Sequence, residues 1–387
     1  MLTVDSTHAF KYQWIVWRLF GLHPSTGDSF WARHYTAYSI AFNVIANICI
    51  PLSFYVGCVK SRTLTEFCEN FYVAAVVIVE QLKLANVLRV RGHLMELHAI
   101  LRQLDKRLQS DEERRIIQSK VVQSRKIFIW VLRLFLMAMA SAACFVAFAP
   151  DWQLPFPAWI PWDWQHSRHI YLITICLQNI GVFILAVIAL NNDTYPVAYL
   201  IMVAGHCKAL ALRIAKLGHS RRMTQSQTQA QMIECIEDHK TILQLVQTME
   251  SSVSFACFIQ FLCTATSLCS LSFFAFYVKM SPLKVLHLFF MLLAIIIETL
   301  IVCYASEQVT HEGEQMAHAI YACNWFNQSV QFRRNLLLML MRSQRPIGIV
   351  AVKTLPVRMR TLVAVIKGAY TMFTLLNELK KTNCQHL

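Results

Sequence analysis

Residues 285–305 read VLHLFFMLLAIIIETLIVCYA, a run of 21 residues with one acidic side chain, Glu298, and no lysine or arginine. An α-helix rises about 1.5 Å per residue, so this run is long enough to cross the ~30 Å hydrocarbon core of a bilayer. Its apolar residues are continuous and do not alternate with polar ones. That pattern favours a membrane helix over a strand of a membrane β-barrel.

Five further apolar runs of this kind precede it in the sequence. They lie at residues 37–59, 71–88, 127–149, 171–190 and 253–278. Of all residues, 56% are hydrophobic and 15% are charged, whereas a soluble domain carries about 25% charged residues. With a seventh, more polar run near the end of the chain, the sequence predicts an all-α, polytopic membrane protein with seven transmembrane helices.

The seventh run, residues 362–379, reads LVAVIKGAYTMFTLLNEL. On a helix with about 100° per residue, Lys367, Thr371, Thr374 and Glu378 fall within roughly 60° of arc. Two leucines one turn apart, Leu375 and Leu379, lie beside this polar stripe. The pattern is typical of a pore-lining helix with an apolar constriction. The alternative is a terminal helix that packs its polar side against other helices.

Positive charge predicts the orientation of the chain. Four segments outside the spans, residues 1–34, 88–126, 205–252 and 306–361, hold 26 of the 36 lysines and arginines. All four lie on one side of a seven-span chain, so the positive-inside bias predicts a cytoplasmic N-terminus and an extracellular C-terminus. A metabotropic seven-helix chemoreceptor needs the opposite orientation and stays the alternative.

Few residues in the spans carry charge. Glu80 and Lys83 are three residues apart on the second span and are expected to pair on one face of the helix. Glu298 in the sixth span is interpreted as a structural partner more than as a site. In the polar segment that follows, an amphipathic helix is expected from about Met316 to Arg342, ended by Pro346.

Several classes of chemistry find no support in the sequence. It has no glycine-rich phosphate loop and no Gly-x-Ser-x-Gly motif, and the thirteen cysteines do not follow a metal-binding or redox spacing. No enzyme activity, cofactor or metal site is therefore expected. The basic segments lack interleaved aromatic residues, which argues against a nucleic-acid partner.

Residues 318–381 carry motifs of a known family. The motifs include Tyr-Ala-Cys-Asn-Trp at residues 321–325, Arg-Ser-Gln-Arg-Pro at residues 342–346 and Ala-Tyr-Thr-Met-Phe-Thr-Leu-Leu at residues 369–376. This stretch resembles the C-terminal signature of insect odorant receptors, which often have Ser-Tyr-Ser-Phe-Phe-Thr-Leu-Leu in the last motif. The signature residues are Tyr321, Cys323, Trp325, Tyr370 and Phe373. The related gustatory receptors, a second alternative, resemble the chain less at residues 376 and 377.

The resemblance implies a function. Insect odorant receptors are odorant-gated, non-selective cation channels in the plasma membrane of olfactory neurons. A tuning subunit assembles with a shared odorant co-receptor into a heterotetramer, and each subunit contributes its seventh helix to one pore. Matched to that helix, Leu375 and Leu379 take the positions of the pore gate, and Lys367, Thr371 and Glu378 line the pore.

The resemblance also implies an odorant pocket and three regions of the chain. The family binds its small volatile odorant in the outer half of the bundle, among spans two, three, four and six. The pocket residues expected here are Tyr72, Val76, Ala138, Ala142, Phe145, Phe183 and His287. Residues 1–305 form the six-helix bundle with cytoplasmic extensions, residues 306–361 the cytoplasmic anchor segment, and residues 362–387 the pore helix with a short extracellular tail.

Overall fold

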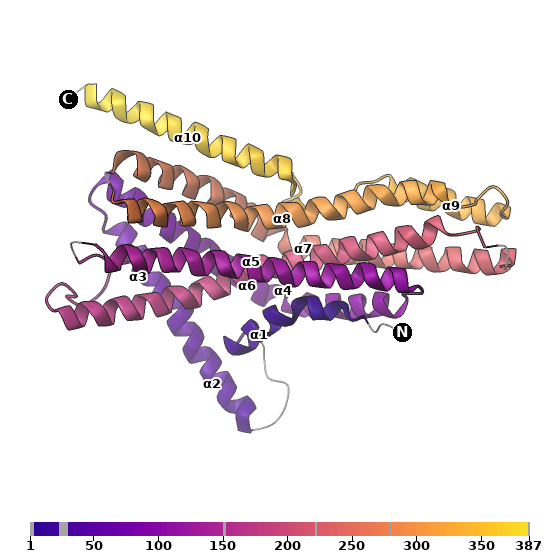
Figure 1. Ribbon diagram of the computed structural model, residues 1–387, viewed down its shortest axis with the longest axis horizontal. Coiled ribbons are helices and arrows are strands. Elements are labelled where there is room, and N and C mark those ends of the chain that lie inside the picture. Colours follow the sequence, from indigo (N-terminus) through magenta and orange to yellow (C-terminus); the bar gives the residue numbers. More distant parts are fainter. Residues whose placement is uncertain (1–3, 23–29, 150–151, 221–222, 279, 386–387) are drawn as a thin grey trace.

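The computed structural model describes residues 4–22, 30–149, 152–220, 223–278 and 280–385, most of them in helices (Figure 1). A short 3₁₀-helix, η1 (Ser6–Phe10), and α1 (Lys11–Leu19) come first. The elements that follow are α2 (Phe30–Val44), the π-helical turn η2 (Ile45–Cys49), α3 (Ile50–Val59), α4 (Leu64–Lys106), α5 (Asp111–Ala147), α6 (Arg168–Ala215), α7 (Gln225–Tyr277), α8 (Pro282–Ala322), α9 (Val330–Ser343), β1 (Val350–Ala351), β2 (Leu355–Pro356) and α10 (Met359–Gln385).

The all-α prediction is confirmed. Within the described residues, six helical stretches are long and apolar enough to cross a membrane. They begin at His34, Glu66, Asp111, Arg168, Gln225 and Pro282, and each contains all or nearly all of one of the first six predicted spans. The seventh predicted span lies in α10, which has 27 residues, enough to cross a bilayer, and carries the polar stripe.

Helices α4 to α8 are much longer than a membrane is thick. They have between 37 and 53 residues, and 53 residues of α-helix extend about 80 Å. The predicted spans gather at the end of the bundle that holds α3 and residues 152–167. The same helices continue to the opposite end, where α9 lies (Figure 1). We refer to these as the α3 end and the α9 end.

The middle of α6 is the centre of the molecule. Every residue from Ile188 to Cys207 is buried, which fits a stretch that is apolar on nearly all sides. Helices α4, α5, α7 and α8 surround it, together with η1 and α1. The ring of Phe10 packs on Tyr199 and His98, and burial lowers the pKa of His98 to about 4, so this ring is neutral at pH 7.

The expected helix from Met316 to Arg342 is wrong in one respect, because two helices occupy this region. Helix α8 ends at Ala322, and α9 starts after Ser329, whose Oγ accepts a hydrogen bond from the Phe332 N–H. Asn324 interrupts the helix because its groups bond elsewhere. Its backbone N–H donates to Leu217 O (3.0 Å) and its side-chain amide donates to Gly218 O (2.9 Å).

The hairpin formed by β1 and β2 was not expected from the sequence. Its strands pair antiparallel, Val350 with Pro356 and Ala351 with Leu355. The Val350 N–H donates to Glu250 on α7 (3.1 Å), and Ser254 accepts from the Val352 N–H (2.7 Å). The hairpin therefore attaches the start of α10 to α7.

Gly218 gives a direct test of the turn where Asn324, which follows α8, hydrogen-bonds to the residues that follow α6. Its φ is +76°, and a Cβ there would lie 2.6 Å from Asn324 O. We expect Gly218→Ala to destabilise the protein by at least about 1–2 kcal/mol, seen as a lower Tm of the purified protein in detergent. The matched control is Gly92→Ala in α4, where a Cβ meets nothing within 4 Å and helix propensity predicts a small gain. A Gly218→Ala protein as stable as wild type would contradict the role of this turn.

Candidate ligand-binding site

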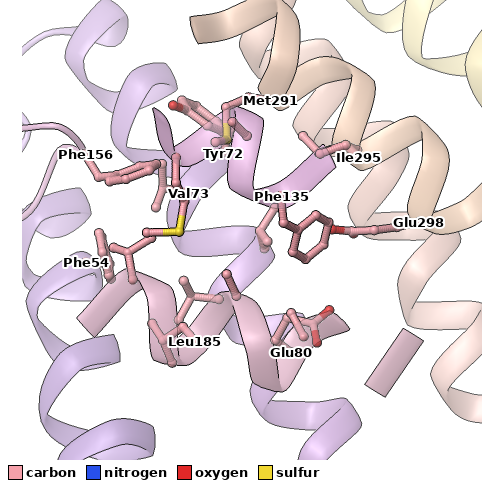
Figure 2. Close-up of a pocket in the computed structure, with 18 of the residues that line it drawn as sticks. Phe54, Tyr72, Val73, Glu80, Phe135, Phe156, Leu185, Met291, Ile295 and Glu298 are labelled. Atoms are coloured by element: carbon pink, nitrogen blue, oxygen red, sulfur yellow. The ribbon is translucent and has the colours of Figure 1, made fainter. Parts of the chain in front are cut away.

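A cavity of about 140 Å³ lies between α3, α4, α5, α6 and α8, towards the α3 end of the bundle (Figure 2). Most of its walls are apolar. They include Phe54, Val73, Val77, Phe135, Met139, Phe156, Val182, Leu185, Ala186, Ala189, Met291, Ala294 and Ile295. A cavity of this size in another protein takes benzene, so the space suits a small organic molecule.

Three of the predicted pocket residues line this cavity. Tyr72 and Val76 reach it from α4, and Ala138 reaches it from α5. Ala142 is one helical turn further along α5 and fully buried, and it belongs to the same hydrophobic cluster as Tyr72 without lining the cavity.

Two other predicted pocket residues line a second hollow nearer the α3 end. Phe145 and His287 border this space of about 690 Å³, which residues 152–165 cover, and Tyr72 borders both spaces. His287 Nδ1 is 3.2 Å from Ser141 Oγ, and its ring meets Phe156 edge to face. The second hollow therefore adjoins the cavity through Tyr72.

Phe183, the last predicted pocket residue, points elsewhere. It is 42% exposed, whereas Val182, Leu185, Ala186 and Ala189 turn towards the cavity at helical spacing. The sequence places α6 beside the cavity but does not reveal which of its apolar faces points inward.

The segment over the second hollow is fixed to the helices. The Trp159 N–H donates to Ser53 O on α3 (2.9 Å), and Gln178 on α6 donates to Phe156 O (2.8 Å). At the rim, Lys284 pairs with Glu69 at 2.8 Å, and both side chains are partly exposed.

Charged residues lie at the boundary of the cavity that is away from the second hollow. Lys83 Nζ lies 2.5 Å from both Glu80 Oε1 and Asp193 Oδ1, and the three side chains are at least nine-tenths buried. The predicted Glu80–Lys83 pair is confirmed. Asp193 was missed as its third member because it lies on α6, 110 residues away in the sequence. The signal that could have found it is an Asn-Asp-Thr triplet inside an apolar helix.

Glu298 reaches the cavity from α8, next to Phe135 in Figure 2. Its Oε2 accepts a hydrogen bond from Gln260 Nε2 on α7 (3.3 Å). Gln260 also donates to Thr299 (3.3 Å), whose hydroxyl lies 2.7 Å from Thr264. Glu298 is thus a structural partner of α7, as interpreted from the sequence, and also part of the cavity wall.

The three acids are close enough to raise the question of a metal ion. One carboxylate oxygen each from Glu80, Asp193 and Glu298 lies within 4.8 Å of the others. Lys83 already places its ammonium group against two of the three. The lysine therefore supplies the positive charge that a metal ion would bring, and the cluster is read as a salt-bridge network.

Helix α10 lies at the edge of the bundle (Figure 1) and packs on α7 and α8. Its contacts include those of the buried residues Leu362 and Ala369 and of Phe373, whose ring meets Phe276. The predicted pore-lining residues Lys367, Thr371 and Glu378 are exposed in the single chain, and Leu375 is 60% exposed. The side chain of Leu379, the second predicted gate residue, lies outside the described part of the structure.

The family-signature residues differ in location and burial. Cys323 is buried beside the Asn324 tie between α6 and α8, and Trp325 packs edge to face on Phe326. Tyr321 and Tyr370 are more than two-thirds exposed. A single chain thus leaves two aromatic signature residues uncovered.

Comparison with known proteins gives consistent matches. The family model described as 7tm odorant receptor matches residues 63–370. Odorant receptor 19a of Drosophila melanogaster is 41% identical over 99% of both chains, and odorant receptor 2a of the same species is 30% identical, covering 96% of this chain and 97% of the relative. A solved insect olfactory receptor from Machilis hrabei, in complex with eugenol, superposes with a TM-score of 0.82 at 14% identity, covering 97% of this chain and all of the other.

Removing Lys83 tests the importance of the charge network. Lys83→Met leaves Glu80 and Asp193 buried without their cation, and we expect a loss of about 3–5 kcal/mol in stability, measured as a lower Tm and a smaller folded fraction in size-exclusion chromatography. Adding Glu80→Gln and Asp193→Asn should restore part of that loss. Lys216→Met is the control, because Lys216 and Glu112 pair on the surface and are more than half exposed. Equal effects of the two lysine substitutions would refute this role.

Proposed function

Because this chain belongs to the insect odorant receptor family, whose members are multi-pass membrane proteins, we propose that it is the ligand-tuning subunit of an odorant-gated, non-selective cation channel. The observation that carries the proposal is the apolar cavity of about 140 Å³, whose lining residue Ile295 packs in one cluster with Ala369 of the helix predicted to line the pore. The related fold solved with eugenol supports a small organic ligand for this architecture.

The ligand binds by shape and dispersion. Side chains from five helices surround the cavity, and most of them are aliphatic or aromatic. Burial of an apolar molecule in such a space is favourable without directional bonds, which suits a volatile compound. Tyr72, Val76 and Ala138 are the predicted residues that make this contact.

Two side chains that line the cavity, Ile295 and Val76, pack in one cluster with a residue of α10. Ile295 lines the cavity and belongs to the same packed cluster as Leu268 on α7 and Ala369 on α10. A ligand that presses on Ile295 therefore favours one position of α10 over another, and differential binding of this kind shifts a gating equilibrium.

The pore forms when α10 helices meet around a central axis. In the proposed heterotetramer with the shared co-receptor, Leu375 and Leu379 form the apolar gate, and Lys367, Thr371 and Glu378 face the ion path. The exposure of this helix in a single chain supports a role in assembly. The N-terminus is cytoplasmic and the C-terminus extracellular in this proposal.

The regions of the chain follow from this arrangement. Residues 1–305 bind the odorant, residues 306–361 anchor the subunit on the cytoplasmic side, and residues 362–387 supply the pore helix and a short tail. The receptor acts in the plasma membrane of sensory dendrites.

We expect fast odorant-evoked cation currents in cells that express this chain with the co-receptor while G-protein signalling is blocked, and little current from the chain alone. Leu375→Ala should alter gating or ion preference, because it removes apolar bulk from the constriction. Val363→Ala, a change to another exposed residue of α10, is the control. A current that requires G-protein signalling, or an N-terminal tag accessible on intact cells, would instead support a metabotropic receptor.

Ile295→Ala should weaken the link between cavity and pore. We expect the odorant concentration for half-maximal current to rise roughly three- to tenfold, equivalent to a coupling on the order of 1 kcal/mol. Leu286→Ala is the matched control, because Leu286 is on the same helix and 46% exposed. An unchanged dose response for Ile295→Ala would remove Ile295 from the pathway.

A further inference from the structure

We propose that the cavity selects ligands that carry a hydroxyl group on a small apolar skeleton, and that the carboxylate of Glu298 accepts the hydrogen bond from this hydroxyl. The inference rests on the proposed odorant-binding role of the cavity and names the chemical class of its ligand.

The polar side chains of the cavity differ in how fully they are engaged. Glu80 accepts from Lys83 (2.5 Å) and from Asn192 Nδ2 (3.4 Å), so both of its oxygens have donors. Gln81 donates to Asn47 on the neighbouring helix (3.4 Å). Tyr72 lies well apart from the two glutamates in Figure 2. These groups leave Glu298 as the acid with capacity to bind a donor.

Glu298 is incompletely satisfied. Its only hydrogen bond among the described residues comes from the neutral amide of Gln260, at 3.3 Å to Oε2. No ion pair joins it to a cation in the described part of the chain, since Lys83 contacts Glu80 and Asp193. The residue is 7% exposed, and Figure 2 shows its carboxylate directed towards the cavity beside Phe135.

A second observation points to unmet hydrogen bonding in the charge cluster to which Glu80 and Glu298 belong. Among the described residues, Asp193 Oδ2 and Asn192 Oδ1 of this cluster are buried without a partner, and both residues line a separate space of about 30 Å³ behind the cavity wall. The cluster also holds three acids against one lysine. Of this cluster, Glu80 and Glu298 line the cavity itself, so its acidic acceptors lie at one end and most of the remaining wall is hydrocarbon.

This asymmetry discriminates between functional groups. A ligand hydroxyl at the Glu298 end supplies the missing donor, and leaving a buried acceptor without a donor is costly. A ketone or aldehyde brings an acceptor against an acceptor, and a hydrocarbon leaves the carboxylate unsatisfied. A site built to bond a hydroxyl rejects an analogue that lacks it, because the buried polar group of the site stays unpaired.

The test uses three probes with one skeleton: benzyl alcohol, benzaldehyde and toluene. Binding is measured as the ligand-dependent rise in Tm of the full-length chain in lipid nanodiscs, a readout that does not depend on channel activity. We expect half-maximal stabilisation by benzyl alcohol at a concentration at least about tenfold lower than by benzaldehyde or toluene.

Glu298→Gln should bring benzyl alcohol and benzaldehyde within about threefold of each other, since its amide donates to a carbonyl and accepts from a hydroxyl. Glu314→Gln is the matched control: it makes the same substitution at an exposed position of α8 away from the cavity and should keep the preference for the alcohol. If Glu298→Gln does not fold, the wild-type comparison still decides the matter.

Equal affinities of wild type for the three probes, no stabilisation by any of them, or a preference that survives Glu298→Gln would overturn the inference. The channel proposal fails separately, if a chain that binds benzyl alcohol gives no current with the co-receptor.

Discussion

The ammonium group of Lys83, held between Glu80 and Asp193, determines how the helices meet at the base of the cavity. A buried charge is tolerated only when it is paired and hydrogen-bonded, so α4 and α6 cannot slide or rotate past each other without separating these groups. Glu298 extends the polar network to α7 through Gln260. The cavity lies directly on this network, where packing is constrained by charge on one side and is apolar on the other.

A single packed cluster of side chains connects the cavity wall to α10. Ile295 borders the cavity and shares a packed cluster with Ala369. Closely packed side chains transmit displacement because no space absorbs it. In contrast, the α9 end is stabilised by backbone ties such as Asn324 to Leu217, so a movement near the cavity can leave that end unchanged.

The sequence predicted what depends on composition and local spacing. Apolar runs gave the spans, and the separation of Glu80 and Lys83 gave their pair. Contacts between residues far apart in the sequence were not predicted. Asp193 meets Lys83 only after α4 and α6 pack. Asn324 interrupts a helical pattern because it bonds to a turn at Gly218. The cavity face of α6 was missed for another reason. A helix that is apolar all round has no polar face from which its rotation can be inferred.

The complete burial of residues 188–207 has a consequence for biosynthesis. Helix α8, one of the elements that cover this stretch, ends at Ala322, more than a hundred residues later in the chain. While the ribosome is still making that part, the centre of α6 has incomplete cover and exposes apolar surface to lipid, to the translocon or to chaperones. The centre of α6 is therefore expected to stay partly uncovered until α8 has been synthesised, and a premature stop before α8 should yield a product that quality control removes.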